Sequence, residues 1–316
     1  MNVTLAQMRT QLSVIIPVYN EEKNIPLLYT RLKVTLKKIS NDHEVIFVDD
    51  GSVDNSFKII SKLRNRDKKI KILTFSRNFG HMPAVTAGLS HAVGKKIVIM
   101  DADLQDPPEI IENLWKESIK GYDVVYAIKR KRKEMFLKRF LFDSFYKLLN
   151  SISSYKMPVD SGTFSLIDKK VANILIGLPE KNKYLSGLRA WTGFKQVGIT
   201  YERARRHAGK PMSLRKLIKL AMDGFVSFSY VPLRLASFLG FITASIAFIF
   251  IVVVLILRIF LGFGLIGWAS TLSAILLFSG VQLITLGIIG EYLARIYDEV
   301  KQRPEYIISN KIGFDR

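Results

Sequence analysis

The sequence predicts an α/β fold with a mostly parallel, Rossmann-like sheet, followed by two C-terminal transmembrane helices. Short apolar runs rich in Val and Ile alternate with helical segments over residues 12–127, and this spacing is typical of βαβ units with right-handed crossovers. Polar clusters follow four of these runs, where ligands bind in open α/β sheets. Residues 235–257 and 259–290 contain no charged side chain. A ligand-binding α/β domain with a membrane anchor is therefore expected.

The elements are expected in a regular order along the first half of the chain. The predicted strands are residues 12–18, 44–49, 70–75, 97–100 and 123–127. Between them we expect a helix from about Asn24, a helix through Arg66 with Asp54 as its N-cap, and a helix from about Pro83 to Val93. Pro108 suits the first turn of a further helix, because the N–H that proline lacks would have no partner there.

Composition narrows the class of ligand. The chain has 316 residues, a formal net charge of +20 and no cysteine. Thiolate metal sites, disulfides and cysteine nucleophiles are therefore excluded. The positive charge indicates an anionic partner, which on charge alone could be nucleic acid, anionic lipid or a phosphorylated substrate.

The strand at residues 97–100 ends on two carboxylates one residue apart, Asp101 and Asp103. Carboxylate oxygens at a strand end can hold a hard divalent cation and leave positions open for a diphosphate. Two turn aspartates that cap the next helix are the alternative. The residues of this run alone leave both interpretations open.

The turns also narrow the kind of nucleotide. The sequence contains neither G-x-G-x-x-G nor G-x-x-x-x-G-K-[ST], which disfavours dinucleotide oxidoreductases and P-loop enzymes. Carboxylates stand at these turns instead, and they can accept hydrogen bonds from a base or ribose or hold a metal on phosphates. A metal-bound nucleoside diphosphate fits this pattern.

The two uncharged stretches are read as membrane crossings. At about 1.5 Å per residue, residues 235–257 would extend roughly 35 Å, and the second crossing is expected from about Trp268 to Ile289. A buried core hairpin is the alternative. Residues 1–11 lack an apolar core, so no signal peptide is expected. Lys and Arg flank the pair on both sides while the loop carries only Arg258, which places both termini in the cytoplasm of a multi-pass protein of the inner or plasma membrane.

Four motifs in order carry a family resemblance. They are Pro17-Val18-Tyr19-Asn20-Glu21, Val48-Asp49-Asp50-Gly51-Ser52, Ser76-Arg77-Asn78-Phe79-Gly80 and Asp101-Ala102-Asp103-Leu104-Gln105-Asp106-Pro107-Pro108. Together they resemble family 2 glycosyltransferases, and most closely the polyprenyl-phosphate glycosyltransferases, a group that includes dolichol-phosphate mannose synthase and the GtrB-type bactoprenol glucosyltransferases. The resemblance extends over nearly the whole chain, because the GtrB type also ends in two membrane helices.

The resemblance implies a GT-A fold and an inverting, Mg²⁺- or Mn²⁺-dependent transfer of a sugar to polyprenyl phosphate. Glucose from UDP-glucose is the expected donor, and undecaprenyl or dolichyl phosphate the expected acceptor, giving a lipid-linked sugar for glycan or lipopolysaccharide modification. Membrane lipids and further copies of the chain, bound through the membrane helices as a homo-oligomer, are the other expected partners. No nucleic acid partner is expected.

The resemblance also implies site residues. The donor nucleotide would be held by Pro17, Tyr19, Glu21, Asp50 and Asp101, and the metal by Asp101, Asp103 and Gln105. Asp103 and Asp160 would be catalytic, since Val159-Asp160-Ser161-Gly162-Thr163-Phe164 resembles the family's Asp-x-Gly-x-Phe element near the transferred sugar. His81 is expected to be a local cap rather than a ligand.

Two basic clusters are expected to bind the acceptor or donor phosphates. They comprise Lys129, Arg132, Arg203, Arg205 and Arg206. The chain departs from the family at two nearby places: Ala127-Ile128-Lys129 replaces Gly-x-Arg, and Gly209-Lys210-Pro211-Met212-Ser213 replaces Gly-x-Ser-Lys-Tyr.

The expected domains are a cytoplasmic catalytic domain over residues 1–210, a juxtamembrane amphipathic helix over 211–232, two transmembrane helices over 233–290 and a cytoplasmic tail over 291–316. Within the catalytic domain, apolar residues at helical spacing predict an amphipathic interfacial helix at about 134–151.

Three other functions compete with this interpretation. A processive polysaccharide synthase of the same fold should carry Gln-x-x-Arg-Trp and more membrane helices, whereas this chain has Arg189-Ala190-Trp191 and two crossings. A GDP-mannose-using dolichol-phosphate mannose synthase would share the acceptor. A non-catalytic module for anionic ligands would not need Asp101, Asp103 and Asp160 together.

Overall fold

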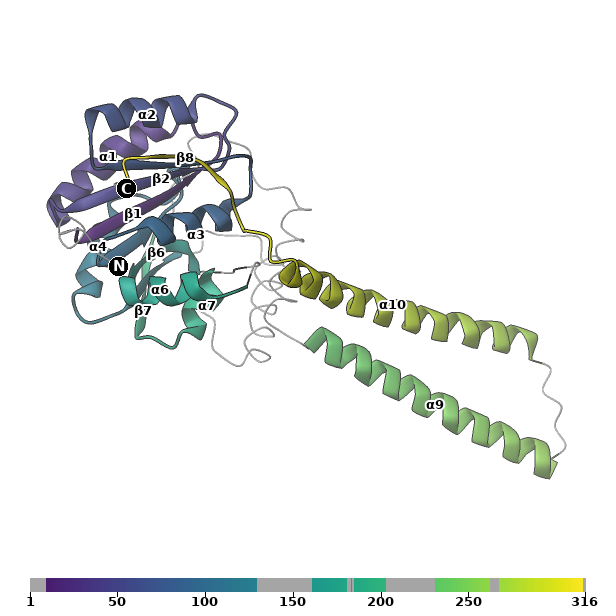
Figure 1. The fold of residues 1–316 in the computed structure, drawn as a ribbon. Coiled ribbons are helices and arrows are strands. Elements are labelled where there is room, and N and C mark those ends of the chain that lie inside the picture. Colours follow the sequence, from purple (N-terminus) through teal and green to yellow (C-terminus); the bar gives the residue numbers. More distant parts are fainter. Residues whose placement is uncertain are drawn as a thin grey trace. The chain divides into compact units, whose positions relative to one another are not determined.

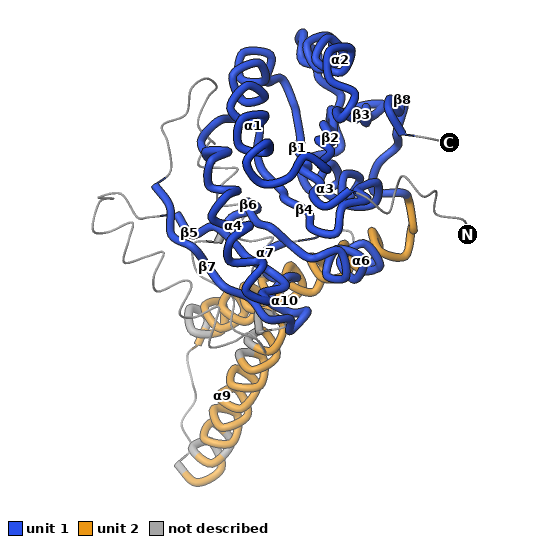
Figure 2. The backbone as a smooth tube through the Cα atoms, turned by 90° about the vertical axis from the view of Figure 1, so that its left-hand side faces the viewer, with its two compact units in different colours: residues 1–214, 304–316 blue, residues 215–303 orange. Residues whose placement is uncertain are grey.

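The strands predicted before residue 130 all form, each within two residues of its expected bounds. The computed structural model describes residues 10–129, 161–180, 183, 185–202, 231–261 and 267–314. The chain divides into two compact units, residues 1–214 with 304–316, and residues 215–303 (Figure 2).

The first unit is built on one mixed sheet (Figure 1). Its strands are β1 (Leu12–Val18), β2 (His43–Asp49), β3 (Ile70–Phe75), β4 (Lys96–Ile99), β5 (Val124–Lys129), β6 (Ser161–Asp168), β7 (Gln196–Tyr201) and β8 (Ile308–Ile312). Within the described residues the sheet has eight strands in the order β7-β5-β6-β4-β1-β2-β3-β8. Only β6 and β8 run antiparallel to their neighbours there, so the predicted mostly parallel sheet is confirmed.

Helices cover both faces of this sheet. They are α1 (Ile25–Ile39), α2 (Ser56–Arg66), α3 (His81–His91), α4 (Ile110–Ser118), α6 (Lys169–Gly177) and α7 (Leu185–Trp191). Helices α1, α2 and α4 pack into one core with the strand residues that include Val14 and Ile16, whereas α3 packs on the opposite face near Ile15. All seven residues of β1 are buried, because a central strand of a parallel sheet is covered on both sides.

Helix α3 approaches β1 unusually closely. A Cβ added to Gly88 would come 2.3 Å from a methyl group of Ile15. Glycine is therefore required at this helix position by packing rather than by backbone conformation.

One capping prediction is wrong. The N-cap of α2 is Asn55, not Asp54, and its side chain makes no capping hydrogen bond. Asp54 lies one residue earlier and accepts hydrogen bonds from the backbone N–H groups of Ser56 and Glu22 at 2.9 and 3.2 Å. It thus joins the loops after β1 and β2 instead of only closing the helix.

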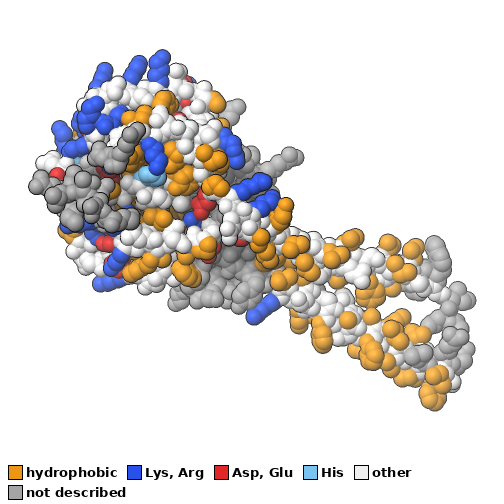
Figure 3. Space-filling model, in the orientation of Figure 1, with side chains coloured by type: hydrophobic (Ala, Val, Ile, Leu, Met, Phe, Trp, Pro, Cys, Tyr) orange, Lys and Arg blue, Asp and Glu red, His pale blue; other side chains and the backbone are white. Residues whose placement is uncertain are grey.

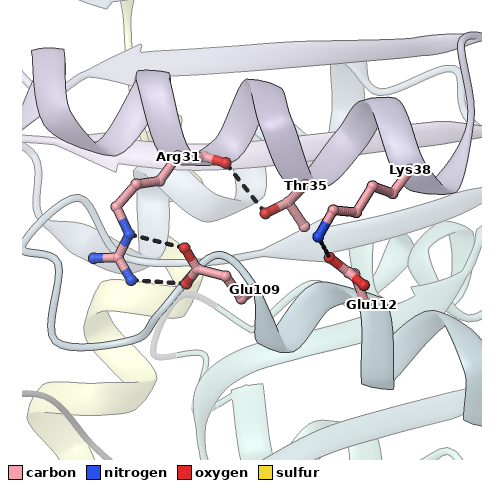
Figure 4. A network of polar contacts seen from close by, with 5 residues as sticks. All are labelled: Arg31, Thr35, Lys38, Glu109 and Glu112. Carbon is pink, nitrogen blue, oxygen red and sulfur yellow. Dashed lines mark hydrogen bonds and ion pairs between the residues drawn. The ribbon is translucent and has the colours of Figure 1, made fainter.

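Helix α1 is joined to the start of α4 by ion pairs (Figure 4). The Arg31 guanidinium donates to both carboxylate oxygens of Glu109 at 2.9 and 2.7 Å, and Lys38 pairs with Glu112 at 2.9 Å. These side chains are partly exposed, so each pair contributes at most about 1 kcal/mol. Their position matters more than their energy, because Glu109 comes shortly after residues 101–106, which we call the acidic loop.

The second unit holds two long helices, α9 (Val231–Leu261) and α10 (Trp268–Val300). Each is long and apolar enough to cross a bilayer, over Ala236–Val254 and Thr271–Val300, and neither stretch is buried in the protein. Figure 3 shows hydrophobic side chains along both helices, and Phe241 is 73% exposed. A core hairpin would be buried, so the exposure argues against that alternative and favours membrane spans.

The chain after α10 does more than the expected tail. Helix α10 continues to Val300, and Ile308–Ile312 then form β8 at the edge of the mixed sheet, beside β3. This strand was not among the predicted elements. The predicted amphipathic helices, at about 134–151 and 211–232, lie outside the described residues.

Candidate functional site

The site lies at the edge of the sheet where β1, β2, β3 and β4 end. Because these strands are parallel, the loops after them emerge at the same edge, as expected for a ligand site in an α/β sheet. The antiparallel β6 begins at that edge, and β5 and β7 end there. Among the described residues, seven strands named here therefore have one end at this edge, and one of them, β4, leads into the run that starts at Asp101.

The acidic loop begins two residues after β4 ends. The Asp101 side chain is 28% exposed, while Asp103 is buried, at 7% exposure. The backbone N–H of Gln105 donates to Asp103 Oδ1 at 3.1 Å. Leu104, between Asp103 and Gln105, has a φ of 60°. Residues other than Gly and Asn rarely adopt this conformation. Strain of this kind costs roughly 1–3 kcal/mol and is typical of ligand sites.

His81, expected to be a cap, contacts the acidic loop instead. Its Nε2 lies 2.8 Å from Asp101 Oδ1, and Gly80 is the N-cap of α3. Desolvation by the surrounding loops would lower the pKa of the imidazole. The hydrogen bond to Asp101 and the charges of Asp101, Asp50 and Asp103 outweigh this effect, so the pKa is raised. His81 thus lies near three acids with predicted roles: Asp50 and Asp101 toward the donor nucleotide, and Asp101 and Asp103 toward the metal.

Asp50 fastens two of the converging loops together. One of its carboxylate oxygens accepts from the backbone N–H of Phe79 at 2.7 Å and the other from that of Gly80 at 2.9 Å. Its side chain is buried, which raises its pKa, although these two hydrogen bonds act in the opposite direction. Each carboxylate oxygen has a second lone pair, so Asp50 can still accept from a nucleoside, and that role stays a prediction.

The loop after β1 presents one large exposed side chain. Tyr19 is 46% exposed, whereas Pro17 is buried within β1. Asn20, with a φ of 56°, accepts from the backbone N–H of Val53 at 2.9 Å and so bridges to the loop after β2. Glu21 Oε2 accepts from the side-chain amide of Asn24 at 2.5 Å. Tyr19 is therefore the member of this predicted group best placed to lie against a base.

A buried arginine forms hydrogen bonds with the start of β6. Arg189 of α7 is 1% exposed and donates to the carbonyl oxygens of Gly162 at 2.9 Å and Thr163 at 3.5 Å. The Thr163 hydroxyl in turn donates to Asp101 Oδ1 at 3.5 Å. Lys129 also reaches this point, since a Cβ on Gly162 would come 3.1 Å from its Nζ.

A buried hydrogen bond joins the end of the acidic loop to the end of β7. The Tyr201 hydroxyl donates to Asp106 Oδ1, and both side chains are buried. Tyr201 closes β7 immediately before the segment that contains Arg203, Arg205 and Arg206. The acidic loop is therefore tied to the strand that leads into the predicted phosphate-binding cluster.

The structure thus brings together Tyr19, Glu21, Asp50, Asp101, Asp103, Gln105 and Lys129 at one edge of the sheet. Asp160, Arg132, Arg203, Arg205 and Arg206 lie outside the described residues, and their roles stay predictions. Three residues that contact or support the predicted site, His81, Thr163 and Arg189, were not predicted to do so. For His81 a signal existed, because it follows a strand that ends at the same edge.

The donor set suits a divalent cation shared with a substrate. Among the described residues, no group of three or more His, Cys, Asp or Glu side chains is arranged to hold a metal ion by itself. Mg²⁺ is commonly bound by one or two carboxylates together with substrate phosphates. The Asp101 and Asp103 carboxylates, at the edge where the parallel strands end, fit that arrangement.

The sequence is similar to known proteins over most of its length. A model of the family described as glycosyl transferase family 2 matches residues 13–175. YkcC of Bacillus subtilis, an uncharacterized glycosyltransferase, is 45% identical over 96% of this chain and 95% of its own. A prophage bactoprenol glucosyl transferase homolog of Escherichia coli is 39% identical over 94% of this chain and 98% of its own. Among solved structures, glucosyl-3-phosphoglycerate synthase from Mycobacterium tuberculosis is a distant match, with 16% identity and a TM-score of 0.48 over 71% of this chain and 80% of that one.

Proposed function

The chain belongs to glycosyltransferase family 2, a family of GT-A fold enzymes, and on this premise we propose that it transfers glucose from UDP-glucose to the phosphate of a membrane polyprenol. The observation that carries the proposal is an acidic nucleotide-type site in the same chain as two exposed apolar helices. The full-length relatives named bactoprenol glucosyl transferase support the same acceptor and sugar. The reaction inverts the configuration at the anomeric carbon.

The donor nucleotide lies across the loops after β1, β2 and β3. Tyr19 offers an exposed ring to the base, and Asp50 and Glu21 offer carboxylate oxygens to the base or ribose N–H and O–H groups. Asp50 also fixes the loop 76–80, so binding of the nucleotide requires little rearrangement there.

The diphosphate lies at the acidic loop. Asp101 and Asp103, with Gln105 beside them, would hold Mg²⁺ or Mn²⁺. When bound, this cation neutralises the charge that develops on the leaving diphosphate. His81 and Thr163 both contact Asp101, so they keep its carboxylate in one orientation.

The acceptor phosphate attacks the anomeric carbon from the side opposite to the diphosphate. A phosphate monoester has a second pKa of about 6 and is mostly dianionic at neutral pH. Removal of a proton by a strong general base is therefore unnecessary, and Asp160 orients the sugar hydroxyls. Arg203, Arg205, Arg206, Arg132 and Lys129 would bind the phosphates, because cationic side chains near the membrane surface suit a lipid phosphate.

Connectivity supports the proposed topology, a membrane hairpin with both termini in the cytoplasm. Residues 1–214 and 304–316 belong to one folded unit, and the two apolar helices lie between them in sequence. A folded unit stays on one side of the bilayer, which favours a hairpin with both ends on that side. The positive charge flanking the helices supports the cytoplasm as this side. In the cysteine-free chain, a Gly264→Cys variant should be labelled by an impermeant reagent only from outside.

A homo-oligomer formed through the membrane helices remains a prediction, suggested by the apolar surfaces of α9 and α10. Crosslinking of the purified chain in bilayers at high dilution would test it. A single band of the monomer mass would contradict it.

Release of UDP, measured with and without polyprenyl phosphate, separates the competing functions. A polyprenyl-phosphate glucosyltransferase releases UDP from UDP-glucose only when the lipid phosphate is present. A processive synthase would release UDP without it and form a polymer, a binding module would release none, and a mannose synthase would prefer GDP-mannose. The same assay over a panel of nucleotide sugars identifies the donor.

A further inference from the structure

The segment that follows the second membrane helix, residues 304–314, has no part in the reaction described above. It nevertheless belongs to the catalytic unit and forms its edge strand β8. Its antiparallel pairing with β3 runs from Ile72 opposite Ile312 to Phe75 opposite Ile308. The start of β8 therefore lies at the ligand-binding edge of the sheet, and residue 312 lies toward the opposite end.

The contacts at the start of this segment continue beyond the strand into the loop after β3. The backbone N–H of Ser76 donates to the carbonyl oxygen of Ile307 at 3.0 Å. The ring of Tyr306 stacks on that of Phe75, with centroids 5.1 Å apart and planes 9° from parallel. Phe75 and Ser76 are the last residue of β3 and the first residue of the loop 76–80.

The stacking continues through the loop itself. Phe75 meets Phe79 edge to face at a centroid distance of 5.7 Å, and the Arg77 guanidinium lies 4.1 Å from the Phe79 ring centroid. The backbone N–H groups of Phe79 and Gly80 then donate to the Asp50 carboxylate. An unbroken series of contacts thus leads from Tyr306 to Asp50.

The loop 76–80 also presses on the neighbouring turn. A Cβ added to Gly51 would come 2.6 Å from the carbonyl carbon of Arg77, and Gly51 has a φ of 68° that favours glycine. Any displacement of the loop therefore displaces the turn that carries Asp50. The position of these two loops therefore depends on the side chains that pack against Phe75 and Phe79.

We propose that Tyr306 is a positioning residue for the donor nucleotide, acting through Phe75 and Phe79 on the loop 76–80 and on Asp50. The inference rests on the proposed function, because it takes the loops after β2 and β3 as the nucleotide site. In consequence, the strand that returns from the membrane helices completes the donor site.

A purely structural role for the segment makes a different prediction. If β8 only covers the sheet edge, ring removal anywhere along it should lower stability and leave nucleotide affinity unchanged. Phe314 provides the matched position, since its ring contacts His91 at a centroid distance of 5.3 Å and Lys71 at 5.2 Å. These partners lie away from the loop 76–80.

The test compares Tyr306→Ala, Tyr306→Phe and Phe314→Ala in the full-length protein in detergent. UDP affinity in the presence of Mg²⁺ is measured by calorimetry, with the Michaelis constants for UDP-glucose and polyprenyl phosphate. Tyr306→Ala should weaken UDP binding and raise the donor constant about two- to tenfold, the factor expected for one stacked ring pair, without changing the acceptor constant. Tyr306→Phe should restore parental binding, and Phe314→Ala should retain it.

Parental UDP affinity in Tyr306→Ala, or an equal loss in Phe314→Ala, would overturn the inference while leaving the proposed function intact. Failure of the parent protein to bind UDP would overturn both. If Tyr306→Ala does not fold, Tyr306→Leu replaces it, because leucine keeps apolar volume without the ring. The same two outcomes then decide, and hydrogen exchange of residues 76–80 should rise in that variant alone.

Discussion

Replacement of Arg189 by methionine should destabilise the catalytic unit and slow the reaction. Arg189 is the largest of the fully buried side chains among the described residues. It supports Gly162 and Thr163 at the start of β6, and Thr163 contacts Asp101. Methionine is also unbranched and has no charge, and its volume is closer to that of arginine than alanine's is, so the change removes the donors and leaves a smaller cavity than Arg189→Ala would.

The size of the destabilisation depends on which hydrogen bonds the carbonyl oxygens of Gly162 and Thr163 keep when the guanidinium is removed. Thr163 still accepts from the Ser165 hydroxyl at 2.9 Å, and Gly162 keeps a long hydrogen bond of 3.4 Å from Ser186. Each oxygen thus keeps one hydrogen-bond donor, so the variant mainly loses the hydrogen bonds from a charged donor, a cost of about 1.5–3 kcal/mol. The variant also no longer has to bury a cation, and the desolvation cost that it avoids offsets part of this loss. A net cost of about 1–3 kcal/mol is expected, a sizeable share of the roughly 5–15 kcal/mol that stabilises a typical domain.

Urea unfolding in detergent can measure this cost. In a Trp268→Phe background, the tryptophan fluorescence reports only Trp115 and Trp191 of the catalytic unit. Arg31→Met is the matched control, because the Arg31 side chain is 35% exposed and its ion pair with Glu109 contributes at most about 1 kcal/mol. If Arg189→Met unfolds within about 0.5 kcal/mol of the parent, or if Arg31→Met costs as much, the support assigned to Arg189 is wrong.

Three further outcomes are expected. Asp50→Asn should lose one of two backbone N–H bonds, since an amide has a single acceptor oxygen, and UDP affinity measured by calorimetry should fall about tenfold; parental affinity would contradict this. Asp160→Asn should lose about a hundredfold or more in turnover while UDP-glucose binding changes less than about threefold; an equal loss of binding would make Asp160 a donor-binding or structural residue. Burial raises the pKa of Asp67, but hydrogen bonds, led by that from Tyr29, outweigh it and leave the pKa below 3.8. This stabilisation exists above that value and is lost as the pH falls through the lower folded pKa. Asp67→Asn should therefore lower the free energy of unfolding at pH 7 by about 1 kcal/mol, and its difference from the parent should shrink as the pH falls and Asp67 becomes protonated. A difference independent of pH would refute the assignment.

The central strands and the site edge were predictable from local sequence. Runs such as Leu12–Val18 are buried on both faces, so nearly every residue is apolar and the strand has sharp ends. Parallel strands also place their carboxyl ends together, which is why Asp50 and Asp101 could be assigned to one site without knowledge of side-chain geometry. The expected membrane spans fall within α9 and α10 for a similar reason, since uninterrupted apolar sequence is a strong signal.

The missed features depend on distant partners. Strand β8 contains Ser309, Asn310 and Lys311 and lies at an exposed edge, so its composition gives little strand signal, and its partner β3 lies more than two hundred residues earlier. Arg189 was unforeseeable because arginine is rarely fully buried. His81 follows β3 and Asp101 follows β4, and β1 and β2 lie between these strands in the sheet. Their common edge was predictable from the sequence, but the 2.8 Å contact between their side chains was not.

The most direct test is transfer itself, measured with the purified full-length chain, labelled UDP-glucose and polyprenyl phosphate in liposomes. Lipid-linked glucose should form in step with UDP release, only with polyprenyl phosphate and Mg²⁺ or Mn²⁺ present. EDTA or Asp103→Ala should abolish it while the protein stays folded and membrane-bound. UDP release that is independent of polyprenyl phosphate, or near-normal turnover of Asp103→Ala in EDTA, would contradict metal-dependent glucosyl transfer to a lipid phosphate.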